Sequence, residues 1–254
     1  MRPPPVDDAR HNQSALTLRS TISTPEGKRR YVRQLFAAIA DDYDFITRFL
    51  SYGQDRRWKR QLLDLAAPGQ GDRVLDLACG TGDLLVPAAE RARAAVGLDI
   101  TYRMLQLARS RAAPGCVPSL VSGDMLALPF RDAHFELVTT GYGLRNVVDL
   151  RTALAEIHRV LAPGGTFLSL DFNRPANGAV RTLYLAYLTV VGAALGFILH
   201  GDPDTYRYIP ESIRLYPGAA GVGRLMTETG FSDVRVVPLL RGLMAIHVGR
   251  KEGL

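Results

Sequence analysis

Short apolar runs alternate with longer amphipathic segments through the middle of the chain. The apolar runs predict five strands, at residues 73–77, 95–99, 119–122, 135–140 and 166–172, of which the first should be buried. Between them, apolar side chains recur at helical spacing, which predicts helices at 84–93, 104–112 and 150–161. Strands that alternate with helices in this way are typical of a parallel sheet covered by helices on both faces.

The N-terminal quarter of the chain has a different pattern. Residues 1–27 are polar, contain three consecutive prolines and are rich in serine and threonine, so we expect a disordered tail. Residues 28–66 repeat apolar side chains at helical spacing, with Leu35, Phe36 and Ile39 on one face. This segment predicts a helical cap on the domain that follows.

The C-terminal end of the chain extends the sheet. Residues 221–229 predict a helix, and 231–237 and 243–248 predict two further strands, which bring the sheet to seven. We therefore expect residues 28–254 to form a single α/β domain. Its sheet should be doubly wound, mostly parallel and Rossmann-like.

A run without charged residues, from Leu183 to Leu199, follows the fifth strand. A membrane-spanning helix needs about 20 apolar residues, with a lower limit near 17, so this run has marginal length for a span. Three interpretations stay open: a helix buried against the sheet, a lid over an apolar substrate, and a helix that spans the membrane or lies on it. With the polar, aromatic segment after it, the run forms an apolar helical insertion at 178–216, which we expect to cover a substrate.

The turn after the first strand carries the most specific chemistry. Asp76 lies at the carboxyl end of that strand, and Gly80 and Gly82 flank Thr81 in a tight turn that lets the backbone approach a ligand. A dinucleotide fingerprint has a third small residue that this turn lacks, and Asp83 would repel a phosphate. The turn therefore favours S-adenosylmethionine over a nicotinamide cofactor, with a turn that binds nothing as the remaining alternative.

Acids also follow the next two strands. Asp99 ends the second strand, where a carboxylate accepts hydrogen bonds from two ribose hydroxyls. Asp124 follows the third strand and can accept a hydrogen bond from an adenine amino group, with Met125 against the ring. The alternative for Asp124 is a turn or a helix N-cap. At the end of the fourth strand, residues 141–146 mix small, aromatic and charged side chains, which indicates the lining of a pocket.

Composition narrows the range of partners. A net charge of +6 and a pI of about 9.5 mildly favour anionic surfaces such as lipid headgroups. No basic run carries interleaved aromatic residues, so we do not expect a nucleic-acid partner. Cys79 and Cys116 are too few for a disulfide framework and fit a reducing cytoplasm. We expect no metal, since no Cys/His cluster is present, and no secretory signal.

Taken together, these residues resemble the class I S-adenosylmethionine-dependent methyltransferases, which share these acids and the Gly-x-Gly turn. More closely, the chain is similar to the ubiquinone/menaquinone biosynthesis C-methyltransferases. The stretches that carry this likeness are Tyr43-Asp44 with Trp58-Lys59, Tyr142 to Asn146, and Tyr206 to Arg214. After its Pro-Gly-Gly the family usually has Glu and Ser two residues apart, where this chain has Asp171 and Asn173.

The resemblance implies methylation of a ring carbon of a reduced prenyl quinol, either demethylmenaquinol or its ubiquinone-pathway equivalent. Two alternatives are another lipid-like or polyketide aromatic, and an inactive accessory subunit of a quinone-synthesis complex. The cofactor residues that it implies are Asp76, Gly80, Thr81, Gly82, Asp99, Asp124, Met125, Gly141 and Tyr43. The catalytic candidates are Arg145, to stabilise a quinolate oxygen, and Asp171, Tyr142 and Tyr206, to position or deprotonate the hydroxyl.

The resemblance also bears on location and partners. It implies a cytoplasmic enzyme with a hydrophobic, quinol-like substrate. The run from Leu183 to Leu199 would allow peripheral contact with the inner face of the membrane. A homodimer stays open.

Overall fold

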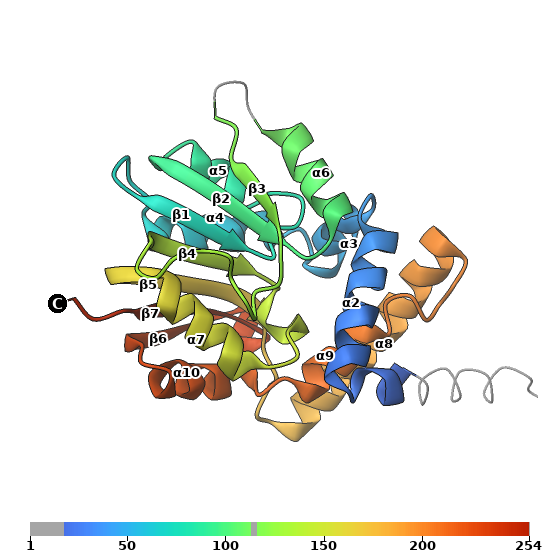
Figure 1. The fold of residues 1–254 in the computed structure, drawn as a ribbon. Coiled ribbons are helices and arrows are strands. Elements are labelled where there is room, and N and C mark those ends of the chain that lie inside the picture. The colour runs from blue at the N-terminus through green and yellow to red at the C-terminus, as the bar shows by residue number, and fades with distance from the viewer. Residues whose placement is uncertain (1–17, 113–115, 254) are drawn as a thin grey trace, which may run out of the picture.

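A computed structural model describes residues 18–112 and 116–253 of the chain. Its strands form one seven-stranded sheet in the order β3-β2-β1-β4-β5-β7-β6 (Figure 1). The strands are β1 (Arg73–Leu77), β2 (Ala94–Asp99), β3 (Ser119–Ser122), β4 (Phe135–Gly141), β5 (Leu161–Phe172), β6 (Ser232–Leu239) and β7 (Met244–Arg250). Only β7 runs antiparallel to its neighbours, so the predicted mostly parallel, seven-stranded α/β fold is confirmed.

The order of the strands creates a switch point at the centre of the sheet. From β1 the chain moves outward through β2 to β3, and then returns to place β4 on the other side of β1. Leu77 of β1 pairs with both Leu98 and Thr140, so the strands end close together. Ligands of open α/β sheets bind where the strand order reverses, beyond the carboxyl ends. The glycine turn after β1 and the segment after β4 meet there.

Helices cover both faces of the sheet. Apolar side chains of α4 (Asp55–Ala66) and α5 (Leu85–Ala89) pack on one face, and those of α7 (Leu150–Val160) and α10 (Gly218–Glu228) pack on the other. α6 (Tyr102–Arg111) follows β2. α5 is shorter than the predicted helix at 84–93, because the chain turns back to place the Arg93 N–H on the Asp72 carbonyl.

The predicted helical cap consists of α2 (Pro25–Ile39), α3 (Tyr43–Leu50) and α4. The prediction of disorder is wrong for residues 18–27: residues 18–22 are helical, and Thr24 caps α2 by accepting a 3.2 Å hydrogen bond from the Gly27 N–H. The side chains of Leu18 and Ile22 are buried against Tyr208, which stabilises this start of the chain. Residues 1–17 of the expected tail lie outside the described residues.

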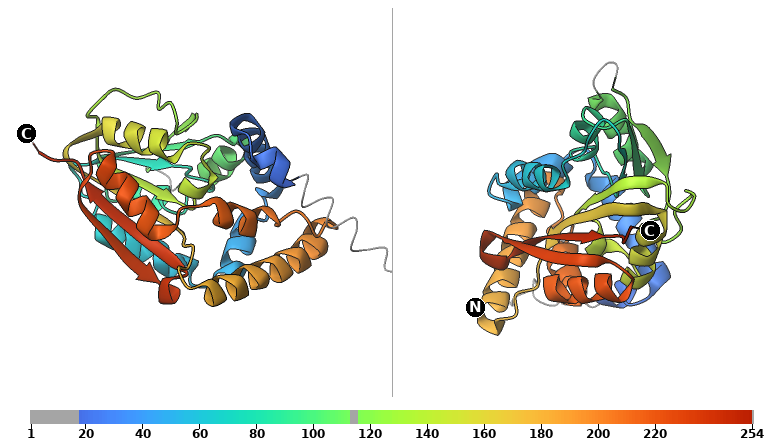
Figure 2. Two further views of the ribbon diagram at one scale, coloured as in Figure 1. Left: turned by 90° about the horizontal axis from the view of Figure 1, so that it is seen from below. Right: turned by 90° about the vertical axis from the view of Figure 1, so that its left-hand side faces the viewer.

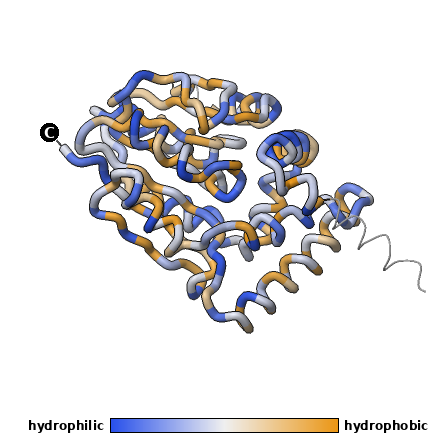
Figure 3. Tube along the Cα trace, turned by 60° about the horizontal axis from the view of Figure 1, so that its bottom comes forward, coloured by the Kyte–Doolittle hydropathy of each residue, from blue (hydrophilic) through white to orange (hydrophobic). Residues whose placement is uncertain are grey.

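The apolar run forms most of α8 (Gly178–His200), and α9 (Tyr208–Leu215) follows it. Asn177 caps α8, and Gly201 ends it with a φ of +68°. Figure 2 shows α8 extending away from the sheet, alongside the cap helices, and Figure 3 shows apolar residues recurring along it. A helix buried against the sheet is therefore not what forms. Among the described residues, α8 alone is long and apolar enough to cross a membrane, by length and composition.

Candidate active site

Two small cavities adjoin the glycine turn at the switch point, with volumes of about 90 and 20 Å³. Tyr43, Gly80 and Gly141 line both cavities. Asp99, Asp124 and Met125 line the larger one, and Asp76 and Thr81 line the smaller one. The structure thus brings together every predicted cofactor residue except Gly82.

Asp99 holds the glycine turn in place. Its Oδ2 accepts a 2.9 Å hydrogen bond from the Gly80 N–H, and its Oδ1 accepts one of 2.8 Å from the Thr101 N–H. Burial raises the pKa of Asp99, and these backbone donors oppose that effect. Each carboxylate oxygen keeps a further lone pair for a ligand. Thr101 lines the same cavity, and its side chain also helps to lower the pKa of Asp99. Free acceptor positions on Asp99 fit a ligand rich in hydroxyl groups.

Asp76 is a buried carboxyl at the end of β1, with 1% of its surface exposed. Its Oδ1 accepts a 2.8 Å hydrogen bond from the Thr139 hydroxyl. Burial raises the pKa of Asp76 to about 7, although the Thr139 bond and nearby Lys59 lower it. A cation beside this carboxyl would stabilise its charged form, so the site suits a positively charged ligand.

Asp124 closes a turn and also contacts the cap. Its Oδ1 accepts a 3.0 Å hydrogen bond from the Leu126 N–H, so the turn function that the sequence left open is present. Its Oδ2 lies 3.1 Å from Arg29 Nε on α2. Arg29, Val32 and Phe36 of α2 line the larger cavity. Ligand sites usually measure about 300–1,000 Å³, so α2 and its Arg29 side chain leave this cavity small for a cofactor.

Gly82 and Thr81 connect the turn to neighbouring helices. Gly82 has a φ of +91°, and a Cβ there would lie 3.2 Å from Val86 Cγ2 and 3.4 Å from Ala108 Cβ. Gly82 therefore allows α6 to pack closely on the turn and lines none of the cavities named here. The Thr81 hydroxyl donates a 2.8 Å hydrogen bond to Asp44 Oδ1 on α3, which joins the turn to the cap.

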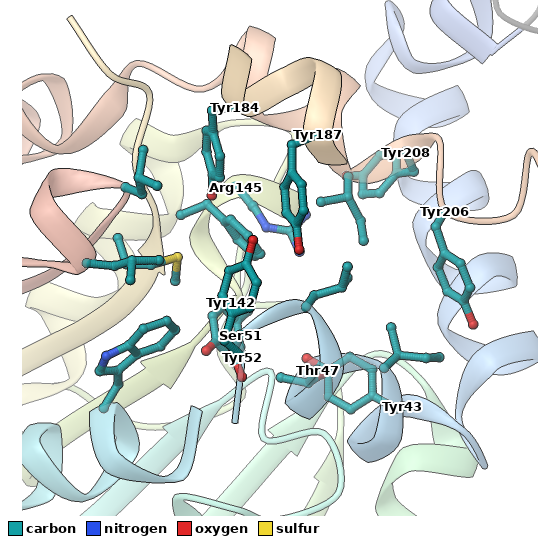
Figure 4. Close-up of a pocket in the computed structure, with 18 of the residues that line it drawn as sticks. Tyr43, Thr47, Ser51, Tyr52, Tyr142, Arg145, Tyr184, Tyr187, Tyr206 and Tyr208 are labelled. Carbon is teal, nitrogen blue, oxygen red and sulfur yellow. The ribbon is translucent and has the colours of Figure 1, made fainter. Parts of the chain in front are cut away.

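A third, larger cavity of about 450 Å³ lies between the cap, the end of the sheet and helices α8 and α9 (Figure 4). We call it the inner cavity. Its walls are mainly aliphatic and aromatic, with Thr47, Ser51 and Arg145 as the polar exceptions besides tyrosines. Tyr43 and Tyr142 line the inner cavity and both smaller ones. These two side chains therefore separate the cofactor side of the site from the apolar side.

Arg145 is the one charged residue among the described residues that line the inner cavity. Its Nε lies 3.2 Å from Asp171 Oδ1, and its Nη1 donates hydrogen bonds to Ser212 Oγ (2.9 Å) and Asn146 Oδ1 (3.1 Å). The guanidinium carbon lies 4.9 Å from the centre of the Phe172 ring. Within the described chain the buried Nε makes no hydrogen bond, although the Asp171 carboxylate lies beside it.

Two of the predicted catalytic residues do not present a free polar group to the inner cavity. Asp171 is 1% exposed and accepts hydrogen bonds from the N–H groups of Arg145 (3.1 Å) and Phe172 (2.8 Å), so it fixes Arg145. Tyr206 lines the cavity, but its hydroxyl shares a 2.7 Å hydrogen bond with His200 Nε2. Figure 4 shows that hydroxyl pointing away from Arg145.

Tyr142 lies at the boundary between the cavities with a φ of +61°, a conformation that residues other than glycine seldom adopt. Its hydroxyl donates a 2.6 Å hydrogen bond to Asp55. Burial, followed by the Asp55 charge, raises the pKa of Tyr142 well above its usual value. Tyr142 is therefore suited to a positioning role and is a poor base.

Other tyrosines of the inner cavity were not predicted as site residues. Tyr184 and Tyr187 lie three residues apart in the apolar run, and this spacing could have indicated that their hydroxyls share one face of a helix. Tyr208 also lines the cavity, and its buried hydroxyl has no hydrogen-bond partner within the described part of the chain. No sequence signal distinguishes Tyr208 from Tyr206.

Comparison with known proteins identifies the family. A sequence profile of the ubiE/COQ5 methyltransferase family matches residues 24–251, which is most of the chain. The chain belongs to this family.

Two curated relatives match this chain over nearly their whole length. The demethylmenaquinone methyltransferase of Thermus thermophilus is 44% identical over 218 residues, which cover 85% of this chain and 99% of that protein. The demethylmenaquinone methyltransferase of Roseiflexus castenholzii is 37% identical over 236 residues, which cover 92% of this chain and 99% of that protein.

Solved structures share the fold of this ubiE/COQ5 protein at low identity. One is an S-adenosylmethionine-dependent methyltransferase from Thermotoga maritima, described as a possible histamine N-methyltransferase, with a TM-score of 0.65, 19% identity, and coverage of 87% of this chain and 99% of that chain. Another is an S-adenosylmethionine-dependent methyltransferase from Mesorhizobium loti, with a TM-score of 0.56 and 17% identity. The match covers 80% of this chain and 100% of that chain. The ubiE/COQ5 protein is therefore a methyltransferase, and its cofactor is S-adenosylmethionine, as predicted.

Proposed function

We propose that this methyltransferase replaces a ring hydrogen of demethylmenaquinol by a methyl group, with the hydrogen released as a proton, and so produces menaquinol. The observation that carries the proposal is the apolar inner cavity, which contains Arg145 and meets the cofactor side at Tyr43 and Tyr142. An aromatic ring with a prenyl tail requires apolar walls and few polar contacts. The names of the curated relatives favour this quinol over its ubiquinone-pathway equivalent and over another lipid-like or polyketide aromatic.

Bound S-adenosylmethionine supplies an electrophilic methyl group on its sulfonium. We assign Asp99 to its ribose hydroxyls, Asp124 and Met125 to its adenine, and Asp76 and Tyr43 to its methionine end. The acids suit a ligand with both positive charge and hydroxyl donors. Asp99 has one backbone donor on each oxygen, and Asp76 has the Thr139 hydroxyl on Oδ1, so both keep acceptor capacity for a ligand.

We assign Arg145 to the developing negative charge on the quinol oxygen beside the reacting carbon. A fixed donor in a dry cavity stabilises such charge far better than water-exposed donors do. Asp171 is a positioning residue, because it holds the backbone and the guanidinium of Arg145. Tyr142 keeps the acceptor and the cofactor on their own sides of the boundary. Tyr206 shapes the cavity, since His200 occupies its hydroxyl.

We further propose that the enzyme is cytoplasmic and contacts the inner face of the membrane through α8. The large apolar side chains of α8 that are most exposed are Leu183, Val190, Phe197 and Ile198. One third of its most apolar window is buried within the protein, which favours surface contact over a span. Flotation with anionic vesicles would test this contact, and light scattering of the same sample would test for a homodimer.

The function is tested by methyl transfer measured with mass spectrometry. Purified protein would receive labelled S-adenosylmethionine and chemically reduced demethylmenaquinone in detergent. We expect label on the ring carbon of the quinol. A protein that binds the cofactor yet labels no quinol would contradict this substrate and would favour the inactive accessory subunit or another aromatic acceptor.

A further inference from the structure

A second apolar cavity adjoins the inner cavity. It measures about 560 Å³ and lies on the outer side of α3 and α8; we call it the outer groove. Its lining residues are Arg48, Phe49, Tyr52, Gly53, Tyr187, Val190, Val191, Ala194, Leu195 and Ile198. Within the described chain, the inner cavity and the outer groove share two lining residues, Tyr52 and Tyr187. The two spaces therefore meet at this pair.

Tyr52 and Tyr187 form a stacked pair between the two spaces. Their ring centres lie 5.8 Å apart and their planes differ by 21°. Tyr52 comes from the turn between α3 and α4, has a φ of +52° and is 60% exposed. A side-chain hydrogen bond between the two tyrosines accompanies the stacking. Because Tyr52 is mostly exposed, it can swing away from Tyr187 at little cost in buried area. The pair is thus a contact that can open without unfolding its surroundings.

The outer groove is apolar although much of it faces solvent. Phe49, Val190 and Ile198 are 49%, 69% and 74% exposed. Arg48 is the one charged residue that lines the groove within the described chain. An exposed apolar surface of this kind indicates a binding partner that is itself apolar. Its continuity with the inner cavity points to a ligand that occupies both.

We propose that the outer groove binds the prenyl tail of the substrate, while the quinol ring lies in the inner cavity. This inference rests on the proposed function. The inner cavity, of about 450 Å³, lies toward the lower end of the roughly 300–1,000 Å³ that drug-sized ligands occupy. A ring that carries a long prenyl tail is larger than such a ligand, so the tail must leave this cavity. The path past Tyr52 and Tyr187 leads it onto apolar side chains of α3 and α8.

A pair of matched variants tests the groove. Ala194 and Ala186 are both exposed alanines of α8, but only Ala194 lines the groove. Ala194→Trp would fill the groove, and Ala186→Trp adds the same ring elsewhere on the helix. Each variant and the wild type would methylate two acceptors in the same detergent: a demethylmenaquinol with a single isoprene unit, and one with a long tail.

We expect Ala194→Trp to lower kcat/KM for the long-tailed quinol by about ten-fold or more, since each methylene kept out of an apolar site weakens binding. Its activity on the short-tailed quinol should stay within about two-fold of the wild type, which also reports that it folds. Ala186→Trp should leave both activities near the wild-type value. Equal effects of Ala194→Trp on both acceptors would overturn the tail groove and leave the proposed function intact.

A binding measurement without turnover provides a second test. The oxidised quinones, titrated calorimetrically into detergent-solubilised protein, should bind more tightly when the tail is long. Ala194→Trp should abolish this gain, and Ala186→Trp should preserve it. A gain that survives in Ala194→Trp would overturn the groove. A wild-type protein that methylates neither quinol would instead overturn the proposed function, and the tail groove with it.

Discussion

The Tyr142 hydroxyl donates a 2.6 Å hydrogen bond to Asp55 and so ties the segment after β4 to the first turn of α4. The contact continues into an ion network, since Lys59 Nζ lies 2.8 Å from Asp55 Oδ2 and 2.7 Å from Asp83 Oδ2. Lys59 also lies over the Tyr142 ring, 5.4 Å from its centre. The cap is thereby joined to the glycine turn at the point where the cofactor side and the inner cavity meet.

This network predicts that two substitutions lower the free energy of unfolding by different amounts. Lys59→Met leaves the carboxylates of Asp55 and Asp83 without their shared buried cation, which typically costs about 3–5 kcal/mol. Tyr142→Phe removes one hydrogen bond to a charged group, worth about 1.5–3 kcal/mol. Urea unfolding should therefore show a larger loss of stability for Lys59→Met.

A control for this comparison is Arg91→Met, since Arg91 and Asp64 form an exposed ion pair at 3.9 Å. Such a pair contributes at most about 1 kcal/mol, so this variant should unfold near the wild-type urea concentration. If Lys59→Met were as stable as Tyr142→Phe, Lys59 would not balance the charges of Asp55 and Asp83 as argued above.

Arg145→Ala should separate turnover from cofactor binding. Loss of a fixed donor to developing negative charge typically lowers turnover by about 10²–10³-fold. The affinity for S-adenosylmethionine, measured by calorimetry, should stay within about two-fold, because Arg145 lines the inner cavity and neither of the two small ones. Arg151→Ala, at an exposed ion pair with Glu228, is the control. Equal loss of turnover and cofactor affinity would make Arg145 structural.

Asp171→Asn extends this prediction to a positioning residue. Asp171 acts through Arg145, so the double variant Arg145→Ala, Asp171→Asn should lose little more turnover than Arg145→Ala alone. Additive losses of turnover would show that Asp171 acts independently of Arg145.

Most of the fold could be predicted because its cause is local. The strands β1, β2, β4 and β5 are rich in buried apolar residues, as a parallel sheet covered on both faces requires. The positions of Asp76, Asp99 and Asp124 follow from this topology, since the ends of parallel strands share one edge. Rotation of a side chain depends on distant packing partners, so the sequence could not show that His200 occupies the Tyr206 hydroxyl.

Two further results had no local signal. Gly80 and Gly82 both belong to the Gly-x-Gly motif, and the sequence does not show that Ala108 packs against Gly82. The direction of α8 depends on its contacts with the cap, and its apolar composition is compatible with burial, with a lid and with a membrane surface. The sequence therefore left these interpretations open.

The two glycines of the turn should respond differently to alanine. At Gly80 (φ +54°) the nearest atoms to an added Cβ are 3.9 Å or more away, so Gly80→Ala adds strain of roughly 1–2 kcal/mol and places a methyl group beside the cofactor cavities. We expect it to weaken S-adenosylmethionine binding more than stability. Gly82→Ala combines a φ of +91° with close contacts to Val86 and Ala108, so thermal unfolding should show the greater loss of stability.

Gly71→Ala is the control for the glycine turn, since an added Cβ at Gly71 meets no atom within 4 Å. It should change neither cofactor affinity nor stability noticeably. A Gly82→Ala protein of normal stability that no longer binds the cofactor would contradict the packing role assigned to Gly82.

The contact between Arg29 and Asp124 should slow cofactor entry. The 3.1 Å ion pair holds α2 over a cavity of about 90 Å³, and the Arg29 side chain is 54% exposed. Such a pair contributes about 1 kcal/mol or less, so Arg29→Ala should barely change the melting temperature. It should raise the association rate of S-adenosylmethionine, measured by stopped-flow fluorescence, several-fold. Arg33→Ala, an exposed position on the same helix, should not. An unchanged association rate in Arg29→Ala would show that α2 does not limit entry.

The raised pKa of Asp76 predicts how the affinity for the cofactor depends on pH. Burial raises the pKa of Asp76 to about 7, so the carboxyl is mostly neutral at pH 6 and mostly charged at pH 8. The positive charges of S-adenosylmethionine favour the charged form. Its affinity should therefore rise roughly ten-fold from pH 6 to pH 8. Calorimetry across this range should show proton release on binding near pH 7. Asp76→Asn should bind more weakly at pH 8 and lose the pH dependence.

The cofactor-free protein should show the opposite trend in stability. The folded pKa of Asp76 lies above the value of about 4 expected for an unfolded aspartate, so the folded state holds this proton more tightly. Asp76 therefore makes the free energy of unfolding fall as the pH rises from about 4 to about 7. In Asp76→Asn this part of the fall should be absent, and the variant should be more stable than the wild type at pH 8. If the two proteins lost stability in parallel over this range, the raised pKa of Asp76 would be excluded as the cause of both effects.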